Sequence, residues 1–252
     1  MPSHTFKSQF TTNFEFSQAN SCETNKNSPD FTVVYVHGLY SDPWGRKPEE
    51  IKTFCEEQNI PFFRFELAGH GSDIDSYEQV DFNTWKEQLL EVTDEMVAGK
   101  ILYIGSSIGG WLSLIAARER PQRAAGVIGL APAPDFTYDM ERFVFTPENK
   151  AEMAQKGKCL FPMKDFTYVF TQKMFETARE NLLLESPLAV PCPVHIIHGT
   201  EDKNLDPQKP FKLLKCLQSE DVIVKLIKGS NHRLGRDVDI AEMKNSIRSF
   251  MS

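Results

Sequence analysis

The chain has 252 residues, of which 40% are hydrophobic and 25% charged, and its formal net charge is −7. This is the composition of a folded globular protein, which excludes a disordered or collagen-like chain. An acidic surface repels phosphate groups, which argues against nucleic acid as a partner. No apolar run reaches the roughly 18 residues that a membrane-spanning helix needs, so no integral membrane segment is expected.

The cysteines and the N-terminal segment bear on the cellular compartment. The five cysteines are odd in number, widely scattered and form no Cys-x-x-Cys pair, which predicts a reducing compartment and no cysteine-based zinc site. They are Cys22, Cys55, Cys159, Cys192 and Cys216. Residues 1–20 contain no apolar signal-peptide core, and Lys7 is their single Lys or Arg, unlike an arginine-rich transit peptide. The expected location is the cytoplasm.

The first half of the chain alternates predicted strands and helices. Residues 4–19 carry phenylalanines among polar residues, which predicts a β-hairpin or a pair of edge strands, and residues 21–30 are predicted to be a loop. The run FTVVYV at 31–36 is continuous and β-branched, as in a strand covered on both faces of a parallel sheet. After it we predict a helix at 48–58, a strand at 61–67, a helix at 82–97, a strand at 100–105, a helix at 109–120 and a strand at 125–130.

The alternation resumes after a long interruption. We predict a strand at 194–197, a helix at 207–217, a strand at 222–227 and a helix at 238–251. Alternation of this kind predicts an α/β fold, a three-layer sandwich with a mostly parallel sheet. Structureless loops of about 50 residues are uncommon in compact domains, so residues 135–184 are expected to be an inserted helical lid. Residues 1–134 and 185–252 would then form the core.

The predicted lid is rich in aromatic and methionine side chains. Most of these are expected to bury the lid against the body, and some would line an apolar pocket for an acyl chain or an aromatic group. They are Phe136, Tyr138, Phe143, Phe145, Phe161, Met163, Phe166, Tyr168, Phe170, Met174 and Phe175.

The strongest local signal is the sequence Gly105-Ser106-Ser107-Ile108-Gly109, which matches G-x-S-x-G. A predicted buried strand (KILYIG) leads directly into it and a predicted helix (GGWLSLIAAR) leads directly out, as a nucleophile elbow requires. The two glycines lack a Cβ atom, so the strand and the helix can approach closely. Ser107 is therefore the candidate nucleophile. The alternative is a small-residue turn that only packs a helix on a sheet.

A serine nucleophile needs a general base, and six histidines are available. His232, in the sequence GSNH, follows the last predicted strand and precedes the last helix, where sites collect in such sheets. His4 lies in a terminal segment, His70 is expected to structure its own turn, and His195 and His198 lie on or at the end of a strand. His232 is therefore the candidate base.

The carboxylate that orients the base is expected after another strand end. Asp202, in HGTED directly after the strand VHII, is the candidate, although an aspartate here could also form an Asx-turn. Glu201, Asp206 and Asp135 are alternatives. The order Ser, Asp, His is that of the α/β-hydrolases.

An oxyanion hole needs two backbone N–H groups that point at the developing negative charge. One is expected from Ile108, which follows the nucleophile. The other is expected from Leu39, in the sequence HGLY after the strand FTVVYV.

The motifs VYVHGL, LAGHGSD, IGSSIGGWL, HGTED and SNHR occur in an order that resembles the α/β-hydrolase family and extends over nearly the whole chain. The segments GSSIGGW, CPVHIIHGTED and DVIVKLIKGSNHR are most similar to the subgroup that contains the mitochondrial acyl-glucuronide esterase and palmitoyl-protein thioesterase. The resemblance implies the same triad, Ser107, Asp202 and His232, and hydrolysis of esters and thioesters.

The expected protein is thus a cytoplasmic serine hydrolase that cleaves small-molecule esters or acyl thioesters through an acyl-enzyme on Ser107, with no metal or organic cofactor. A long apolar groove in the lid would favour an acyl-protein thioesterase that removes palmitate. A peptidase is disfavoured because no propeller or other domain sorts peptides. A haloalkane dehalogenase is disfavoured because it would have an aspartate as its nucleophile. A binding protein that keeps the fold without catalysis would be expected to lack a member of the triad.

Overall fold

The computed structural model describes residues 1–18, 29–162 and 167–251. Most of the loop predicted at 21–30 lies outside the described residues, as do Cys22, Met163 and Phe166.

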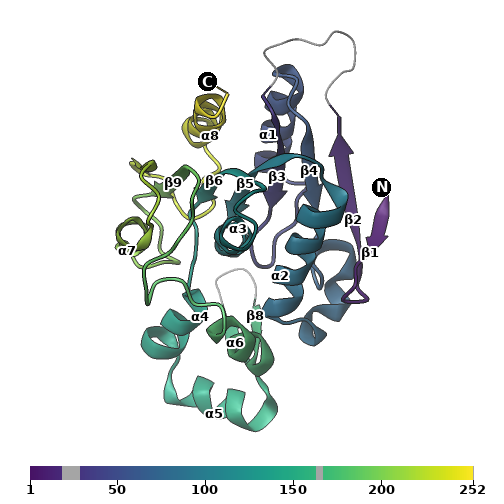
Figure 1. Cartoon of the computed structure of the whole chain (residues 1–252). Coiled ribbons are helices and arrows are strands. Elements are labelled where there is room, and N and C mark those ends of the chain that lie inside the picture. The colour runs from purple at the N-terminus through teal and green to yellow at the C-terminus, as the bar shows by residue number, and fades with distance from the viewer. Residues whose placement is uncertain (19–28, 163–166, 252) are drawn as a thin grey trace.

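An eight-stranded, mostly parallel sheet forms the centre of the molecule (Figure 1), with strand order β1-β2-β4-β3-β5-β6-β9-β10. The six strands from β4 to β10 pair in parallel, whereas β1 and β2 are antiparallel and lie at one edge, which confirms the predicted edge strands. The strands are β1 (Ser3–Thr5), β2 (Thr11–Ser17), β3 (Phe31–Val36), β4 (Phe62–Phe65), β5 (Lys100–Ser106), β6 (Ala124–Leu130), β9 (Val194–Gly199) and β10 (Val222–Ile227).

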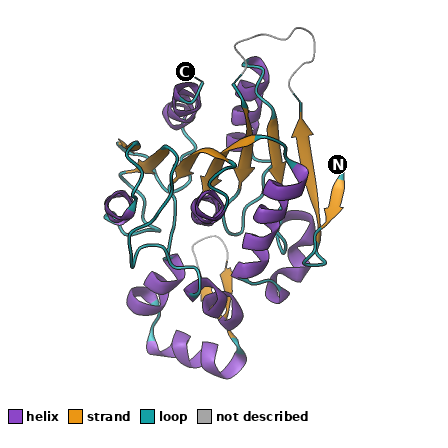
Figure 2. Ribbon diagram, in the orientation of Figure 1, coloured by secondary structure: helices purple, strands orange, loops and turns teal. Residues whose placement is uncertain are grey.

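Helices cover both faces of the sheet (Figure 2), which makes the three layers that the alternation predicted. Successive side chains of β3 point to opposite faces. Val33 and Tyr35 pack in the core beneath α1 and α8, whereas Val34 and Val36 pack in the core beneath α2 and α3. Because both faces are covered, all six residues of β3 are buried. The helices of the body are α1 (Arg46–Glu57), η1 (Gly71–Gln79), α2 (Phe82–Glu91), the π-helical turn η2 (Val92–Met96), α3 (Ile108–Glu119), α7 (Lys209–Cys216) and α8 (Asp237–Ser249).

The segment 135–184 lies below the sheet in Figure 1 and contains the expected helices together with a β-hairpin that the sequence did not predict. Two short antiparallel strands pair from Lys158↔Thr171 to Pro162↔Thr167. The elements are α4 (Phe136–Asp139), the π-helical turn η3 (Met140–Val144), α5 (Pro147–Lys156), β7 (Lys158–Pro162), β8 (Thr167–Thr171) and α6 (Gln172–Arg179). Phe145, Phe170, Met174 and Phe175 are buried, as expected of residues that attach this segment to the body, whereas Phe143 is 71% exposed.

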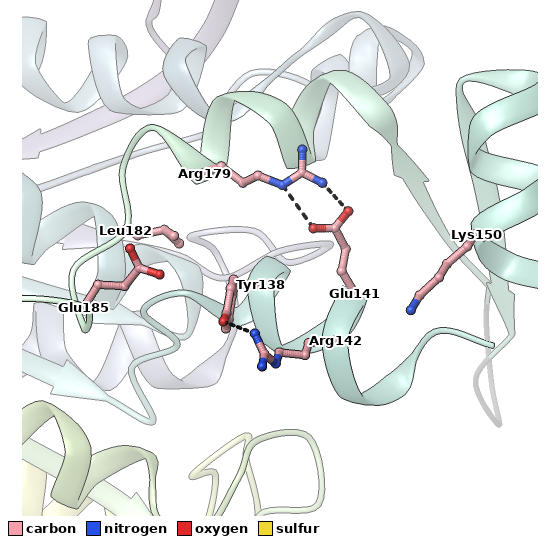
Figure 3. Close-up of a pocket in the computed structure, with 7 residues that line it drawn as sticks. All are labelled: Tyr138, Glu141, Arg142, Lys150, Arg179, Leu182 and Glu185. Atoms are coloured by element: carbon pink, nitrogen blue, oxygen red, sulfur yellow. Dashed lines mark hydrogen bonds and ion pairs between the residues drawn. The ribbon is translucent and has the colours of Figure 1, made fainter. Parts of the chain in front are cut away.

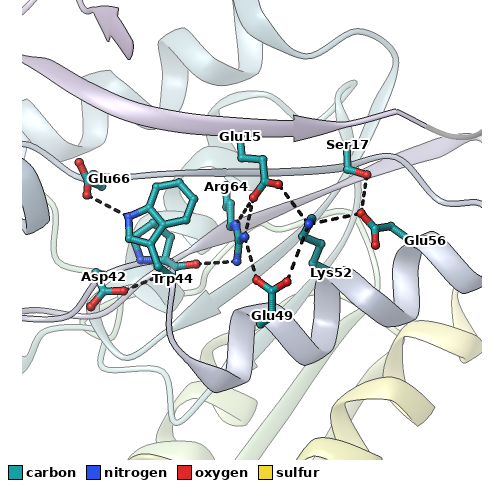
Figure 4. A network of polar contacts seen from close by, with 10 residues as sticks. Glu15, Ser17, Asp42, Trp44, Glu49, Lys52, Glu56, Arg64 and Glu66 are labelled. Carbon is teal, nitrogen blue, oxygen red and sulfur yellow. Dashed lines mark hydrogen bonds and ion pairs between the residues drawn. The ribbon is translucent and has the colours of Figure 1, made fainter. Parts of the chain in front are cut away.

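A network of charged side chains fastens the edge of the sheet to α1 (Figure 4). Arg64 on β4 is buried and lies between Glu15 on β2, 2.7 Å from its Nε, and Glu49 on α1, 2.8 Å from Nη2. Lys52 on α1 also reaches Glu15, at 3.1 Å. The arginine is thus paired on both sides, which a buried charge requires. The network holds α1 against β2 and β4 at this edge of the sheet.

None of the helices in the described ranges is long and apolar enough to cross a membrane. Cys55, Cys159 and Cys192 are buried free thiols, and Cys216 is a half-buried free thiol.

Candidate active site

Ser107 occupies a sharp turn between β5 and α3, where its backbone adopts φ 54° and ψ −117°. A residue other than glycine at such a positive φ costs about 1–3 kcal/mol and persists only where its surroundings enforce it. The backbone N–H of Ser107 donates to the Leu130 carbonyl at 3.0 Å, and the carbonyl of Ser107 accepts from the N–H of Ala133 at 3.0 Å. These two bonds to β6 and the loop after it hold the turn in place.

The two glycines of the G-x-S-x-G motif are required because the chain segments approach closely here. A Cβ atom on Gly105 would lie 2.2 Å from the Gly109 carbonyl oxygen, and one on Gly109 would lie 2.2 Å from the Val36 carbonyl oxygen. Real Cβ atoms do not approach so closely, so any side chain would push α3 away from the sheet. The structure therefore has the strand–turn–helix of a nucleophile elbow.

The structure brings Ser107, His232 and Asp202 into one chain of hydrogen bonds. His232 Nε2 lies 3.1 Å from Ser107 Oγ, and His232 Nδ1 lies 2.7 Å from Asp202 Oδ2. A carboxylate only accepts hydrogen bonds, so Nδ1 carries a proton and the neutral ring presents Nε2 as an acceptor to the serine hydroxyl. The three residues follow β5, β10 and β9, respectively, at the same edge of the sheet.

Asp202 is buried, yet it remains a carboxylate. Burial alone raises the pKa of this carboxyl, but the hydrogen bond and charge of His232 and the Asn204 backbone N–H, 2.9 Å from Oδ1, lower it further than burial raises it. The pKa of Asp202 therefore lies below its ordinary value, and the group can orient an imidazole at neutral pH.

The alternative carboxylates have other contacts. Asp135 is buried at the base of the segment 135–184 and accepts hydrogen bonds from the backbone N–H groups of Leu183 (2.8 Å) and Leu184 (2.9 Å). Asp206 is paired with Lys212 at 2.6 Å. The structure gives neither of them, nor Glu201, a hydrogen bond to His232.

The backbone N–H groups of Leu39 and Ile108 are free to bind an anion. Ile108 is the first residue of α3, where amides have no acceptor within the helix. The loop that carries Leu39 passes close to Ser107, because a Cβ atom on the neighbouring Gly38 would lie 3.3 Å from the Cβ of Ser107. Neither amide has a hydrogen-bond acceptor among the residues that the structure describes.

Two buried histidines support the Leu39 loop. His37 accepts a hydrogen bond from the Leu67 backbone N–H at Nε2 (2.9 Å) and donates one from Nδ1 to the Gly38 carbonyl (2.8 Å). His70 lies edge-on to His37 and binds the Ala68 carbonyl at 3.1 Å, within its own turn as predicted. Burial lowers the pKa of His37 to about 4 and that of His70 to about 3, so both rings are neutral at physiological pH.

Tyr40, which the sequence did not single out, links the Leu39 loop to the segment 135–184. Its backbone has a φ of 52°, and its hydroxyl accepts from the Val169 N–H at 3.0 Å and donates to the Val169 carbonyl at 3.4 Å. The ring lies 5.1 Å from that of Tyr168. The tyrosine thus takes the place of a neighbouring strand at the open edge of β8.

Lys47, at the start of α1, also went unnoticed in the sequence. Its ammonium group donates to Ser106 Oγ at 2.8 Å and to the Arg233 carbonyl at 3.1 Å. Ser106 and Arg233 are the chain neighbours of Ser107, the candidate nucleophile, and His232, the candidate base.

A separate cavity of about 560 Å³ opens on the segment 135–184 (Figure 3). Arg179 from α6 and Glu141 form an ion pair across it, and Arg142 donates to the Tyr138 hydroxyl at 2.6 Å. Lys150 points toward the same space from α5. None of the lining residues contacts the Ser107–His232–Asp202 chain, so this cavity is distinct from the candidate active site. Within the described ranges, no three His, Cys, Asp or Glu side chains cluster so that they could hold a metal ion.

Comparisons with known proteins identify relatives over most of the chain. Residues 65–252 match the prolyl oligopeptidase family. The mitochondrial palmitoyl-protein thioesterase ABHD10 of Rattus norvegicus is 31% identical over 212 residues, which cover 82% of this chain and 71% of the rat protein.

Two solved structures resemble the whole molecule. A protein of Agrobacterium vitis S4 described as a hydrolase has a TM-score of 0.91 at 26% identity and covers 100% of this chain and 99% of its own. The α/β-hydrolase domain-containing protein 10 from mouse has a TM-score of 0.87 at 25% identity and covers 99% of this chain and 97% of its own. The similarity therefore includes the segment 135–184 as well as the sheet.

Proposed function

The chain belongs to the prolyl oligopeptidase family and is an α/β-hydrolase serine hydrolase of the thioesterase group, and on this premise we propose that Ser107, His232 and Asp202 are its catalytic triad. The chain is a hydrolase of carboxylic esters or thioesters. The single observation that carries the proposal is the pair of hydrogen bonds, 3.1 Å and 2.7 Å, that joins the three side chains at the strained turn.

Acylation follows from the positions of the donors and acceptors. Ser107 Oγ attacks the carbonyl carbon of the substrate while His232 Nε2 takes the hydroxyl proton. The negative charge that develops on the carbonyl oxygen accepts hydrogen bonds from the Leu39 and Ile108 amides. The imidazolium then gives its proton to the departing alkoxide or thiolate, and the acyl group stays on Ser107.

Deacylation reverses these roles. His232 takes a proton from a water molecule, the resulting hydroxide attacks the acyl carbon, and the proton returns to Ser107 Oγ as the carboxylic acid leaves. Throughout, Asp202 holds the ring in the Nδ1–H tautomer and stabilises the imidazolium. All the groups that these steps require are supplied by the chain itself and by water.

Residues 135–184 form the lid in this proposal, inserted into a core of residues 1–134 and 185–252. Tyr40, the neighbour of Leu39, connects the body to this lid, because its hydroxyl bonds to the backbone of Val169 on β8. Its half-buried aromatic side chains, such as Phe136, Phe161 and Tyr168, are the candidates to contact an acyl group.

A palmitoyl-protein thioesterase is the second candidate within the same chemistry. It is favoured by the 31% identity with the rat protein of that name. A long-chain thioester needs an apolar surface beside the nucleophile, and the aromatic side chains of the lid would supply it. A binding protein that keeps the fold without catalysis is disfavoured, because all three residues of the triad are present and hydrogen-bonded to one another.

We propose a cytoplasmic location from the usage of cysteine, although the rat relative is named as mitochondrial. Fractionation of cells that express the tagged chain tests the location. Recovery in the mitochondrial fraction would contradict it.

Hydrolysis of p-nitrophenyl esters from two to sixteen carbons tests the reaction and its acyl preference. We expect turnover in the wild type and none above background in Ser107→Ala. Ser113→Ala is a matched control, since Ser113 lies on the same helix and its hydroxyl binds the Gly109 carbonyl rather than a residue of the triad. A peak at long chains favours the palmitoyl thioesterase, and a peak at short chains favours a small-ester hydrolase. Activity that survives Ser107→Ala would overturn the proposed mechanism.

A further inference from the structure

We infer that Lys47 is a positioning residue that locks the nucleophile elbow to the loop of the catalytic base. Ser107 and His232 lie on separate chain segments, and the reaction requires the 3.1 Å contact between them to be kept. The role of Lys47 rests on the proposed function, because it presupposes that these two residues react.

One ammonium group contacts both segments. Lys47 Nζ donates to Ser106 Oγ at 2.8 Å, one residue before the nucleophile, and to the Arg233 carbonyl at 3.1 Å, one residue after the base. Hydrogen bonds from a charged donor are about twice as strong as those between neutral groups. The lysine is therefore a direct bridge between the elbow and the loop, independent of the Ser107–His232 hydrogen bond.

Both ends of the bridge are fixed. Ser106 is buried, and its hydroxyl also bonds to Tyr35 on β3, which is itself 2% exposed. On the other side, the neighbouring Arg46 donates to the Gly235 carbonyl at 2.9 Å and pairs with Asp237 at the start of α8. The first turn of α1 therefore holds residues 233–237 at three points.

The charge of Lys47 faces few other ionisable groups. The negative charge of Asp239 on α8 stabilises the ammonium group of Lys47. Asp239 also accepts hydrogen bonds from the Ser230 hydroxyl and the Arg236 backbone N–H. Tyr35 faces it from β3, through Ser106. Because burial outweighs the favourable field of Asp239, it lowers the pKa of Lys47 to about 8. The ammonium of the bridge therefore loses its proton at a lower pH than that of an exposed lysine.

If the bridge positions the two reacting groups, its loss affects the chemical step rather than substrate binding. Misplacement of a catalytic group by about 1 Å can cost about 100-fold in rate. We therefore expect kcat to fall by about 10- to 100-fold in Lys47→Met, with KM nearly unchanged. Lys47→Arg keeps the charge and the donors, so it should recover most of the activity.

The experiment measures kcat and KM with p-nitrophenyl butyrate from pH 6 to 9.5 for the wild type, Lys47→Met, Lys47→Arg and Lys52→Met. Lys52→Met is the matched control, because Lys52 lies on the same helix but pairs with Glu15, Glu49 and Glu56 (Figure 4), none of which belongs to the triad or its neighbouring residues. Ser107→Ala supplies the background rate. Thermal unfolding of each variant verifies that it is folded.

The pH profile separates positioning from a general structural role. In the wild type we expect kcat to decline above about pH 8 as the ammonium loses its proton. In Lys47→Arg this decline should move to higher pH because a guanidinium stays charged. In Lys47→Met kcat should be low at every pH and should show no such decline. If Lys47→Met does not fold, the comparison of Lys47→Arg with the wild type still tests the role of Lys47, because the alkaline decline of kcat should lie at higher pH in the variant.

Three results would overturn the role of Lys47. They are a wild-type kcat in Lys47→Met, an equal loss in Lys52→Met, and the same alkaline decline in Lys47→Arg as in the wild type. If Ser107→Ala retained activity, the proposed function would fail instead. An inactive Ser107→Ala beside a fully active Lys47→Met would refute the role of Lys47 alone.

Discussion

The hydroxyl of Tyr40 is the direct hydrogen-bonded link between the Leu39 loop and the proposed lid, so its removal should loosen the lid without unfolding the core. In Tyr40→Phe the ring and its contact with Tyr168 remain, but the Val169 N–H and carbonyl lose their partner. The hydroxyl also bonds to Tyr77 on η1, so the change removes that bond together with the hydrogen bonds at the open edge of β8.

The expected magnitude follows from the two distances. The bond from the Val169 N–H, at 3.0 Å, has good geometry, whereas the bond to its carbonyl, at 3.4 Å, is long. A typical hydrogen bond contributes about 0.5–1.5 kcal/mol net, so the pair contributes about 1–2 kcal/mol. A difference of this size changes the ratio of open to closed lid by roughly 5- to 30-fold.

Hydrogen exchange followed by mass spectrometry measures this opening. Protection of the amides of Thr167–Thr171 should fall by about 5- to 30-fold in Tyr40→Phe, while the amides of β3 and β5 keep theirs. Tyr138→Phe is the matched control, because this tyrosine also lies in the lid and its hydroxyl binds Arg142 rather than the body. Protection of β8 that stays within about twofold of the wild type in Tyr40→Phe would refute the reasoning.

Three further predictions concern the triad, the elbow and the response to acid. Asp202→Asn should lower kcat by about 10³- to 10⁴-fold with little change in KM, because an amide no longer selects the Nδ1–H tautomer of His232. Steady-state kinetics measure this effect, and a loss of kcat below tenfold would contradict the prediction. Gly109→Ala should lower the free energy of unfolding in urea by about 3 kcal/mol, since its Cβ would lie 2.2 Å from the Val36 carbonyl oxygen; a wild-type midpoint would contradict it. Burial lowers the pKa of His70 from 6.5 to about 3. The unfolded chain therefore binds the proton more tightly than the folded chain, so the free energy of unfolding falls as pH drops from about 6.5 toward 3. The loss is up to about 1.4 kcal/mol per pH unit. Urea unfolding at pH 7 and pH 5 should therefore show a smaller loss in His70→Gln than in the wild type, and equal losses would contradict the assignment.

The layered architecture could be predicted because burial on both faces of a parallel sheet leaves a readable pattern. The run FTVVYV has no polar alternation, and the structure buries every residue of β3. The lid hairpin could not be predicted in this way. Its strands β7 and β8 are five residues each and only partly buried, so they carry no comparable apolar run.

The candidate site was predictable for a related reason. Side chains that follow parallel strands meet at one edge of the sheet, so Ser107, Asp202 and His232 could be selected by their place after β5, β9 and β10. The G-x-S-x-G motif added the steric signature of the elbow. The contact geometry that joins the three residues agrees with that selection, and their catalytic roles remain a proposal.

The supporting residues could not be selected from the sequence because their partners are distant along the chain. Tyr40 and Val169 are 129 residues apart, and Lys47 and Arg233 are 186 apart. Each is a common residue type in a loop or at a helix end, with no motif that ties it to its partner. Only the folded chain shows that these polar side chains bridge the segments that carry the site.

The most direct test of the central claim is to trap the acyl-enzyme. The protein is mixed with excess p-nitrophenyl butyrate, quenched in acid within milliseconds and digested, and the peptides are measured by mass spectrometry. We predict a butyryl group on Ser107 in the wild type and none in Ser107→Ala. Full turnover of the wild type with no adduct at any quench time, or with the acyl group on another residue, would contradict the mechanism.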